Sequence, residues 1–392
     1  MKALRLTIVL AVFICLSLGT VKASPASAYC GQVLEGMSKL VPLLPLYAHE
    51  ADQVASRMIA GGTLWLTGDQ GFVLEALGRA GGLMACKWLK KPADVKPGDV
   101  VLYGLIRPVQ PADATLLKAA MQAKAWCVTV GPVRPEFAQA YVRVPAPLAD
   151  DPQRLPTISP VEAAATWAFT AELVSALTRQ GKMPPMYQSV LVPGGRERNA
   201  SHLKLTWEPN TPAPIPPVTL GRTYLARVSN CLRRLRATQM GKFALAGKMA
   251  AEATRAGHTA WYCSLGHLPP ELPGQPGDPM VLKPLKLNAP DKLGDFVKSG
   301  DVILYVGYYE PYGPWVETAH KLGAKIVTVV SGTPERRAED MGADLNINGC
   351  WPFGDAVLDV PGGDVKVLPP SGVVAATAYF MLVAETAQAL SS

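Results

Sequence analysis

Two side chains, Glu75 and His267, have the type and the setting that proton transfer requires. A carboxylate can take a proton from the carbon beside a carbonyl, as aldose–ketose isomerisation demands, and a histidine can act as acid or base near neutral pH. Glu75 lies in the run TGDQGFVLEALGRAGGL, residues 67–83, and His267 lies in SLGHLPP, residues 264–270. The alternatives are a solvated helix glutamate and a loop histidine without a role.

Candidate ligand-binding residues follow the ends of apolar runs. One group surrounds glycine-containing turns and comprises Thr67, Gly68, Asp69, Gln70, Ser264 and Gly266. A glycine turn between a strand and a helix is a common place for an anion, but it can also be only a tight turn.

A second group follows the next apolar runs, in GLIRPVQP and GYYEPYGP. Arg107 could hold an anion through a bidentate pair, or it is a solvated side chain. Tyr308 and Glu310 suit a sugar, because rings stack on C–H faces and a carboxylate accepts hydroxyls. A domain or dimer contact is the alternative for these two. Ser159 and Ser371, which begin alanine-rich helices, are predicted N-caps that could also contact a ligand.

An internal repeat sets the elements that position these side chains. KPGDVVLYGLIRP at residues 96–108 returns as KSGDVILYVGYYEP at 298–311, and AGGTLWL at 60–66 returns as AGHTAWY at 256–262. AKAWCVTV at 123–130 and SPVEAAATW at 159–167 return in the same order as AKIVTVV and SGVVAATAY. Four ordered matches indicate a duplication.

The predicted domains are residues 29–193 and 221–392, joined by a proline-rich linker at 194–220 that includes WEPNTPAPIPPVTLG. Each copy opens with a long helix, at residues 30–60 and 224–256, and then alternates strands with helices. Such alternation predicts an α/β fold: two doubly wound αβα domains, flavodoxin-like, each with a parallel sheet. Ligands of such sheets bind beyond the carboxyl ends of the strands, where the candidate residues fall.

The first 28 residues have the pattern of a secretory signal. Lys2 and Arg5 precede the apolar run LTIVLAVFICLSLG, and ASPASA ends in small residues, which predicts a cut after Ala28. We therefore expect an exported protein, periplasmic or secreted, without stable membrane insertion after cleavage; an uncleaved anchor is the alternative. Removal of Lys2, Arg5 and Lys22 lowers the net charge from +7 to +4. The remaining basic residues are scattered, so no nucleic-acid partner is expected.

Six cysteines would remain after cleavage. An even number in an exported chain permits disulfides, although Cys127 and Cys263 fall in strand-like runs where a buried thiol is as reasonable. No Cys-x-x-Cys pair and no histidine-rich spacing is present, so neither a metal site nor a cofactor is predicted.

The halves resemble sugar isomerase (SIS) domains in tandem. The resemblance rests on GRAGGL at residues 78–83, on the GDV strand followed by a helix and GAKIVTVV, and on SGVVAATAYFMLVAE near the end. RAGGL, with Glu75 four residues before Arg79, is similar to the phosphoheptose-isomerase-like branch, and the resemblance puts Glu75 at the position of that branch's base. Members of the family bind phosphorylated sugars as isomerases, aminotransferase domains or regulators.

The sequence departs from the family where a phosphate would bind. The Ser-x-Ser-Gly run expected after the second strand is absent from both halves, and Asp69 stands near where a hydroxyl is expected. The closing helices contain no histidine, which the phosphoheptose-isomerase branch places there.

These observations lead to one interpretation and two alternatives. The leading one is an exported carbohydrate-derivative-binding SIS protein, with or without turnover, whose partner is a small-molecule sugar derivative. The alternatives are a sugar or amino-sugar isomerase or lyase using Glu75 and His267, and a structural protein with vestigial sites. A homo-oligomer is compatible with each of them.

Overall fold

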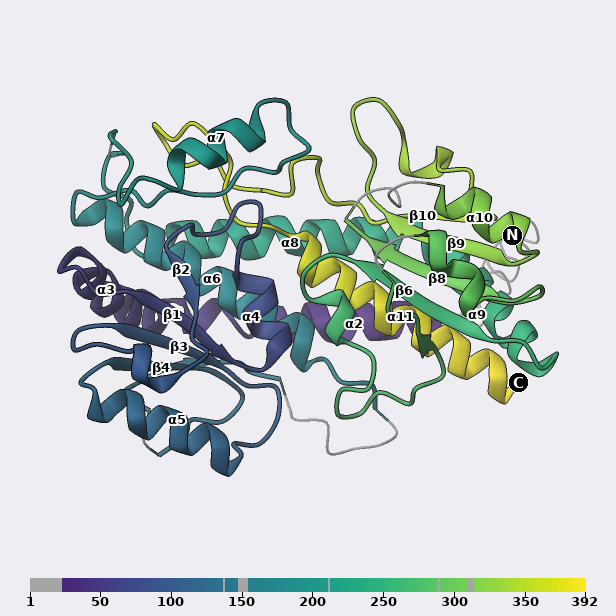
Figure 1. Cartoon of the computed structure of the whole chain (residues 1–392), viewed down its shortest axis with the longest axis horizontal. Coiled ribbons are helices and arrows are strands. Elements are labelled where there is room, and N and C mark those ends of the chain that lie inside the picture. The colour runs from purple at the N-terminus through teal and green to yellow at the C-terminus, as the bar shows by residue number, and fades with distance from the viewer. Residues whose placement is uncertain (1–22, 137, 147–153, 211, 288–289, 309–313) are drawn as a thin grey trace, which may run out of the picture.

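The structure is a computed structural model, and it describes residues 23–136, 138–146, 154–210, 212–287, 290–308 and 314–392. Within these residues the chain folds into two α/β halves, each built on one parallel sheet (Figure 1). The first half lies at the left of the view and the second at the right, with long helices between them.

Each half has a five-stranded sheet with the same strand order. The first sheet, in the order β2-β1-β3-β4-β5, contains β1 (Leu64–Gly68), β2 (Cys86–Trp88), β3 (Val100–Gly104), β4 (Trp126–Gly131) and β5 (Ala140–Arg143). The second, in the order β10-β9-β8-β6-β7, contains β6 (Ala260–Leu265), β7 (Lys283–Pro284), β8 (Val302–Gly307), β9 (Lys325–Val330) and β10 (Leu345–Asn348). All pairings within the sheets are parallel, so the predicted fold class is confirmed.

Helices flank both sheets. Those of the first half are α2 (Pro25–Ser38), α3 (Leu44–Ile59), α4 (Gln70–Ala76), α5 (Pro111–Gln122), α6 (Ile158–Arg179) and α7 (Gly195–His202). Those of the second half are α8 (Thr219–Thr238), α9 (Met240–Arg255), α10 (Trp315–Lys321) and α11 (Ser371–Ser391). Short 3₁₀ helices are η1 (Val41–Leu43), η2 (Pro92–Asp94), η3 (Pro269–Glu271), η4 (Pro290–Asp295) and η5 (Ala338–Asp340).

The structure corrects three local predictions. Each long opening helix is broken in two, in the first half at Pro42 and Pro45, because proline lacks the N–H that a helix interior needs. In the second half the break falls at Gln239, between α8 and α9. The helix of the run 67–83 ends at Ala76 and not at Gly81–Gly82, and the chain after it is extended at Leu77.

The duplicated sequence has a clear structural reason at Asp99 and Asp301. Asp99 accepts hydrogen bonds from the Trp65 indole and from two backbone N–H groups, and Asp301 accepts the same three from its own half, including the Trp261 indole. Each indole lies 2.8 Å from its carboxylate. The repeated GDV and the repeated Thr-x-Trp are therefore two partners of one contact.

The opening helices are exchanged between the halves. Helix α2 packs on α11 of the second half, and α8 packs on α6 of the first. Glu385 of α11 accepts the Ala26 N–H at 2.9 Å, and Glu172 of α6 accepts the Gly221 N–H at 3.0 Å. Because carboxylates at helix N-termini satisfy unpaired N–H groups, each closing helix fixes the start of the other half's opening helix.

Two tyrosines repeat this exchange. Tyr29 on α2 donates to the carbonyl of Pro156, just before α6, at 2.7 Å. Tyr224 on α8 donates to the carbonyl of Pro369, just before α11, at 2.9 Å. These paired contacts relate the two halves as copies and hold them together as one interlocked body.

The closing helices form the centre of the core. Residues 158–178 of α6 are all buried, and α11 is buried over most of its length. By length and composition α11 is also apolar enough to span a membrane, but 72% of its most apolar window is buried inside the fold, as in a core helix. Among the described residues all six cysteines carry free thiols, and Cys127 and Cys263 are fully buried, as their strand positions indicated.

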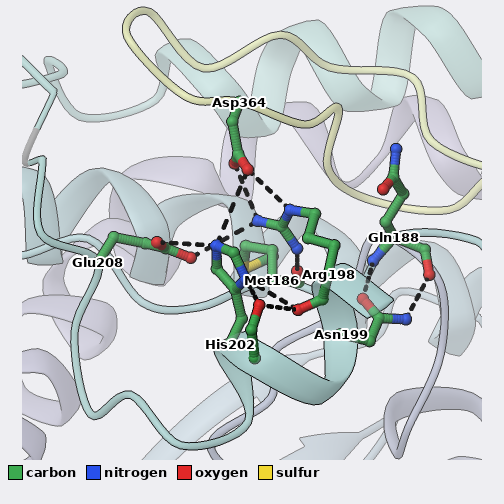
Figure 2. A network of polar contacts seen from close by, with 8 residues as sticks. Met186, Gln188, Arg198, Asn199, His202, Glu208 and Asp364 are labelled. Atoms are coloured by element: carbon green, nitrogen blue, oxygen red, sulfur yellow. Dashed lines mark hydrogen bonds and ion pairs between the residues drawn. The ribbon is translucent and has the colours of Figure 1, made fainter. Parts of the chain in front are cut away.

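The segment predicted as a linker contains more structure than proline content suggested. Residues 195–202 form helix α7, and Figure 2 shows the polar network that ties this helix to the rest of the chain. The described residues of the proline-rich part, 203–210 and 212–218, form no helix or strand before α8 begins.

Candidate functional site

A cavity of about 570 Å³ lies between the halves, beyond the carboxyl end of the second sheet. Its walls come from the loops after β6 and β8, the start of α11, the loop after α4, and residues 187–203. We call it the interdomain cavity. Its polar lining residues are Arg79, Tyr187, Gln188, Ser189, Arg196, Asn199, His267, Tyr305, Tyr308, Asp355 and Ser371.

A smaller cavity of about 190 Å³ lies at the corresponding place in the first half. Loops after β1 and β3 and the start of α6 form its walls, and the segment 268–276 of the second half closes it. We call it the smaller cavity.

The predicted ligand-binding residues separate into these two places. Gly266, His267, Tyr308 and Ser371 line the interdomain cavity, whereas Asp69, Gln70, Arg107 and Ser159 line the smaller one. Thr67, Gly68 and Ser264 line neither of the two, and Glu310 lies outside the described residues.

The strand ends at Gly68 and Gly104 explain why the first loop is a tight turn. Gly68 has φ of +107°, and a Cβ on it would lie 2.2 Å from the carbonyl oxygen of Gly104. A Cβ on Gly104 would in turn lie 2.0 Å from the ring of Phe72. Both positions therefore require glycine for close packing, and neither glycine lines the interdomain cavity or the smaller cavity.

Glu75, the predicted catalytic base, lies in a buried ion cluster that we define as Glu75, Arg79, Asp355 and Ser371. Its side chain is 2% exposed, forms an ion pair with Arg79, and accepts the Trp167 indole N–H at 2.8 Å. Burial raises the pKa of Glu75, and the Arg79 guanidinium opposes that rise. Glu75 does not line the interdomain cavity, so its place does not suit contact with a substrate there.

The ion cluster joins the halves at the floor of the cavity. Arg79 of the first half pairs with Asp355 of the second at 3.1 Å and donates to the Ser371 hydroxyl. The backbone N–H and the hydroxyl of Ser371 both donate to Asp355, at 3.0 and 2.9 Å. Burial raises the pKa of Asp355 to about 6, although Arg79 and Ser371 lower it. Two carboxylates thus already engage the one guanidinium of the cluster.

The two helix-start serines are not N-caps, which corrects that prediction. The N-cap positions are Thr157 and Pro370, so Ser159 and Ser371 lie inside the first turns. The Ser159 hydroxyl donates instead to the side-chain oxygen of Gln275, and Ser371 belongs to the ion cluster.

His267, the second predicted catalytic residue, does line the interdomain cavity. Its Nδ1 lies 2.8 Å from the carbonyl oxygen of Leu74, so Nδ1 carries the proton and Nε2 is the acceptor in the neutral ring. Burial, with the Arg79 charge, lowers the pKa of His267 to about 4. The imidazole is therefore neutral at pH 7, and its Nε2 can accept a hydrogen bond from a ligand.

Arg107 is occupied by acids of its own half. Its Nε lies 2.9 Å from Asp69, and its terminal nitrogens bind Asp113 at 2.6 and 3.2 Å. Asp69 also accepts the backbone N–H of Ile106. Since two carboxylates neutralise this guanidinium, Arg107 does not offer a free positive charge to an anion.

Helix α7 forms a wall of the interdomain cavity and is held by the network in Figure 2. Asn199 accepts the N–H of Gln188 at 2.9 Å and donates to its carbonyl at 2.8 Å. Arg198 binds Asp364 through two nitrogens, at 2.7 and 2.9 Å, and donates to the carbonyl of Met186. The sequence carried no motif for these residues, because a short helix inside a proline-rich segment has no repeat to reveal it.

Among the described residues no group of three His, Cys, Asp or Glu side chains lies close enough to hold a metal ion.

No family model matches the chain, and no curated protein matches it. Solved structures do resemble it along most of its length. A protein assigned as sugar binding from Salmonella typhimurium LT2 has 12% identity and a TM-score of 0.49, with 93% of this chain and 99% of that one covered. The C-terminal domain of glucosamine-fructose-6-phosphate aminotransferase from Francisella tularensis has 10% identity and a TM-score of 0.48, covering 91% and 96%.

A protein assigned as a phosphosugar isomerase from Clostridium difficile 630 has 8% identity and a TM-score of 0.48, with 93% of each chain covered. At these identities and scores the likeness describes a similar chain path and carries no inference about ligand or reaction.

Proposed function

We propose that this chain is a tandem SIS protein that binds a carbohydrate derivative in the interdomain cavity, and that neutral or amino sugars bind better than sugar phosphates. The observation that carries the proposal is the lining of the cavity. Tyrosine rings lie beside amide, hydroxyl and imidazole groups there, which is the mixture that a sugar's C–H faces and hydroxyls require.

The charge of the cavity argues against a phosphate dianion. The buried cation at its floor, Arg79, is engaged by Glu75 and Asp355. Arg196 also lines the cavity, but it is exposed on α7, where water screens its charge. A dianion would therefore approach buried carboxylates without a matched cation, whereas a neutral or cationic sugar would not.

The catalytic alternative rests on one observation, the neutral His267 ring in the cavity wall. A hydrogen-bond acceptor there could position a substrate hydroxyl in an isomerase or lyase. The partner predicted for it, Glu75, is buried in the ion cluster, so a second acid or base would have to come from elsewhere in the cavity. Binding without turnover is therefore the leading proposal.

A thermal-shift comparison tests it. We would measure melting of the chain with glucosamine, glucose and glucosamine 6-phosphate, since a ligand at 100 times its Kd adds about 2.7 kcal/mol of stability. Ala200→Trp, at an exposed position in the cavity lining, should abolish the shift, and Ala226→Trp, on the exposed face of α8, should leave it intact. Tighter binding of the phosphate, or a shift that persists in Ala200→Trp, would refute the proposal.

We also propose that the protein is exported, with cleavage after Ala23 in preference to Ala28. The Ser24 side chain accepts the Ser27 N–H at 3.2 Å, and Ala26 is buried with its N–H on Glu385. A cut after Ala28 would remove these contacts, whereas Val21-Lys22-Ala23 also offers small residues at the two positions that a signal peptidase reads. Mass spectrometry of exported protein tests this: a mature N-terminus at Ser24 is expected, and one at Tyr29 or at Met1 would contradict it.

A further inference from the structure

The smaller cavity contains polar atoms whose hydrogen-bonding capacity no described residue satisfies. Glu162 is 4% exposed and its Oε1 has no partner there, and Gln275 is 8% exposed with an unpartnered Nε2. Both side chains line the cavity. Buried polar atoms in proteins are nearly always paired, so two of them facing one hollow indicate a bound group.

Neighbouring contacts hold these two side chains in place. The Ser159 hydroxyl donates to the Gln275 side-chain oxygen, which turns the amide so that its NH₂ is the free end. The backbone N–H of Leu105, which donates to the Val130 carbonyl, also favours the ionised form of the Glu162 carboxyl, against the effect of burial. The cavity therefore presents a carboxyl oxygen that accepts and an amide nitrogen that donates.

The charges around the cavity are unbalanced toward the negative. Asp69 after β1, Glu271 in η3 and Glu162 on α6 all line it, and Arg107 after β3 is the one cation among the lining residues. That cation is neutralised by Asp69 together with Asp113. Glu162 consequently faces the cavity without a cation of its own.

We propose that the smaller cavity binds a hydroxylated primary amine, with the ammonium group on Glu162 Oε1 and a hydroxyl oxygen accepting from Gln275 Nε2. At about 190 Å³ the hollow is smaller than the usual range for drug-sized ligands and suits a compact amino alcohol or amino sugar. This site is separate from the interdomain cavity and does not depend on what binds there.

Proton release is a specific consequence. Burial and the nearby Asp69 charge raise the pKa of Glu162 well above its usual range, which favours the protonated carboxyl in the empty site. An ammonium ion favours the ionised carboxylate. Binding of the amine should therefore release close to one proton, whereas binding of a neutral analogue should release none.

Calorimetry with a matched pair of probes tests the proposal. Serinol (2-amino-1,3-propanediol) and glycerol differ only at the central carbon, which bears an amine in serinol and a hydroxyl in glycerol. We expect serinol to bind at least tenfold more tightly than glycerol to the full chain, and its heat to differ between buffers of different ionisation enthalpy by about one proton.

Variants of the cavity lining test whether serinol binds in the smaller cavity. Glu162→Gln keeps the size of the side chain and should remove both the preference for serinol and the proton release, and Gln275→Met should weaken serinol binding. Ala200→Trp, which obstructs the interdomain cavity, should leave serinol binding unchanged, so that failure of this proposal is distinguishable from failure of the proposed function. Equal binding of the two probes, no binding of either, or unchanged serinol binding in Glu162→Gln would overturn it.

Discussion

Asp355 should make the protein less stable as pH rises from about 4 to about 7. Its pKa in the folded protein is about 6, against an ordinary value of 3.8. Because the folded state holds this proton more tightly than the unfolded chain, stability from this group is full below pH 4 and is lost as pH rises through 6. A difference of about two pKa units at 1.36 kcal/mol each gives a loss of about 3 kcal/mol.

Asp355→Asn removes the titration and keeps the size of the side chain. Urea unfolding at pH 4.5, 6 and 7.5 would give the free energy of unfolding of the wild type and of the variant. The variant should gain on the wild type as pH rises, by about 2 kcal/mol across this interval, because only the wild type must ionise a buried carboxyl.

Asp301→Asn is the matched control. The Asp301 pKa is lowered by the backbone and indole N–H groups that it accepts, so it is ionised in both states throughout this interval. The control should lose stability by an amount that does not change between pH 4.5 and 7.5. If the difference between Asp355→Asn and the wild type were equally flat, the account of a strained, partly protonated ion cluster would be refuted.

Three further predictions concern packing, the repeat and the cavity histidine. Gly372→Ala would put a Cβ 2.0 Å from a glutamate carboxylate oxygen of the ion cluster and should cost about 1–3 kcal/mol in urea unfolding, while Gly241→Ala, with open space around it, should be neutral or slightly stabilising. Trp65→Phe and Trp261→Phe each remove one donor to a carboxylate and should cost similar amounts, about 2 kcal/mol each; strongly unequal losses would mean that the two copies do not share this contact. His267→Gln should reduce the loss of stability on acidification from pH 6.5 toward 4, since the His267 pKa is lowered to about 4 and the unfolded chain takes up the proton first; an unchanged acid limb in thermal melts would contradict this.

The fold could be predicted from the sequence because each copy of the repeat contains both partners of the contacts that stabilise it. Thr-x-Trp and GDV recur in the same order, with Asp99 36 residues after Thr63 and Asp301 42 residues after Thr259, and each pair is one hydrogen-bonded unit in the structure. The alternation of strands and helices along each copy was then enough to predict two parallel sheets. Helix ends were less accessible, because the turn after Ala76 depends on Arg79 reaching residues almost 280 positions later.

The candidate site was only half visible in the sequence. Residues after the strands, such as Asp69 and His267, could be placed because parallel sheets put their carboxyl ends together. Asp355 and Asn199 could not, since they lie in segments with no repeat and no periodicity, and contacts with Ser371 and Gln188 hold them in place. Glu75, the predicted base, is a buried partner of Arg79, four residues later in the same half.

The two cavities differ because residues 268–276 of the second half cover the smaller cavity, whereas the corresponding stretch of the first half does not cover the interdomain cavity. Leu268, in the second half, approaches Gly71 so closely that a Cβ there would lie 3.0 Å from its side chain, and the segment after it covers the smaller cavity. In the first half the corresponding stretch turns away at Leu77 and sends Arg79 into the ion cluster, which leaves the interdomain cavity open to residues 187–203. The structure therefore contains one larger cavity lined by tyrosines and one smaller cavity lined by carboxyl groups. The ligands proposed for the two cavities differ accordingly, because size and charge are the properties by which a binding site selects its ligand.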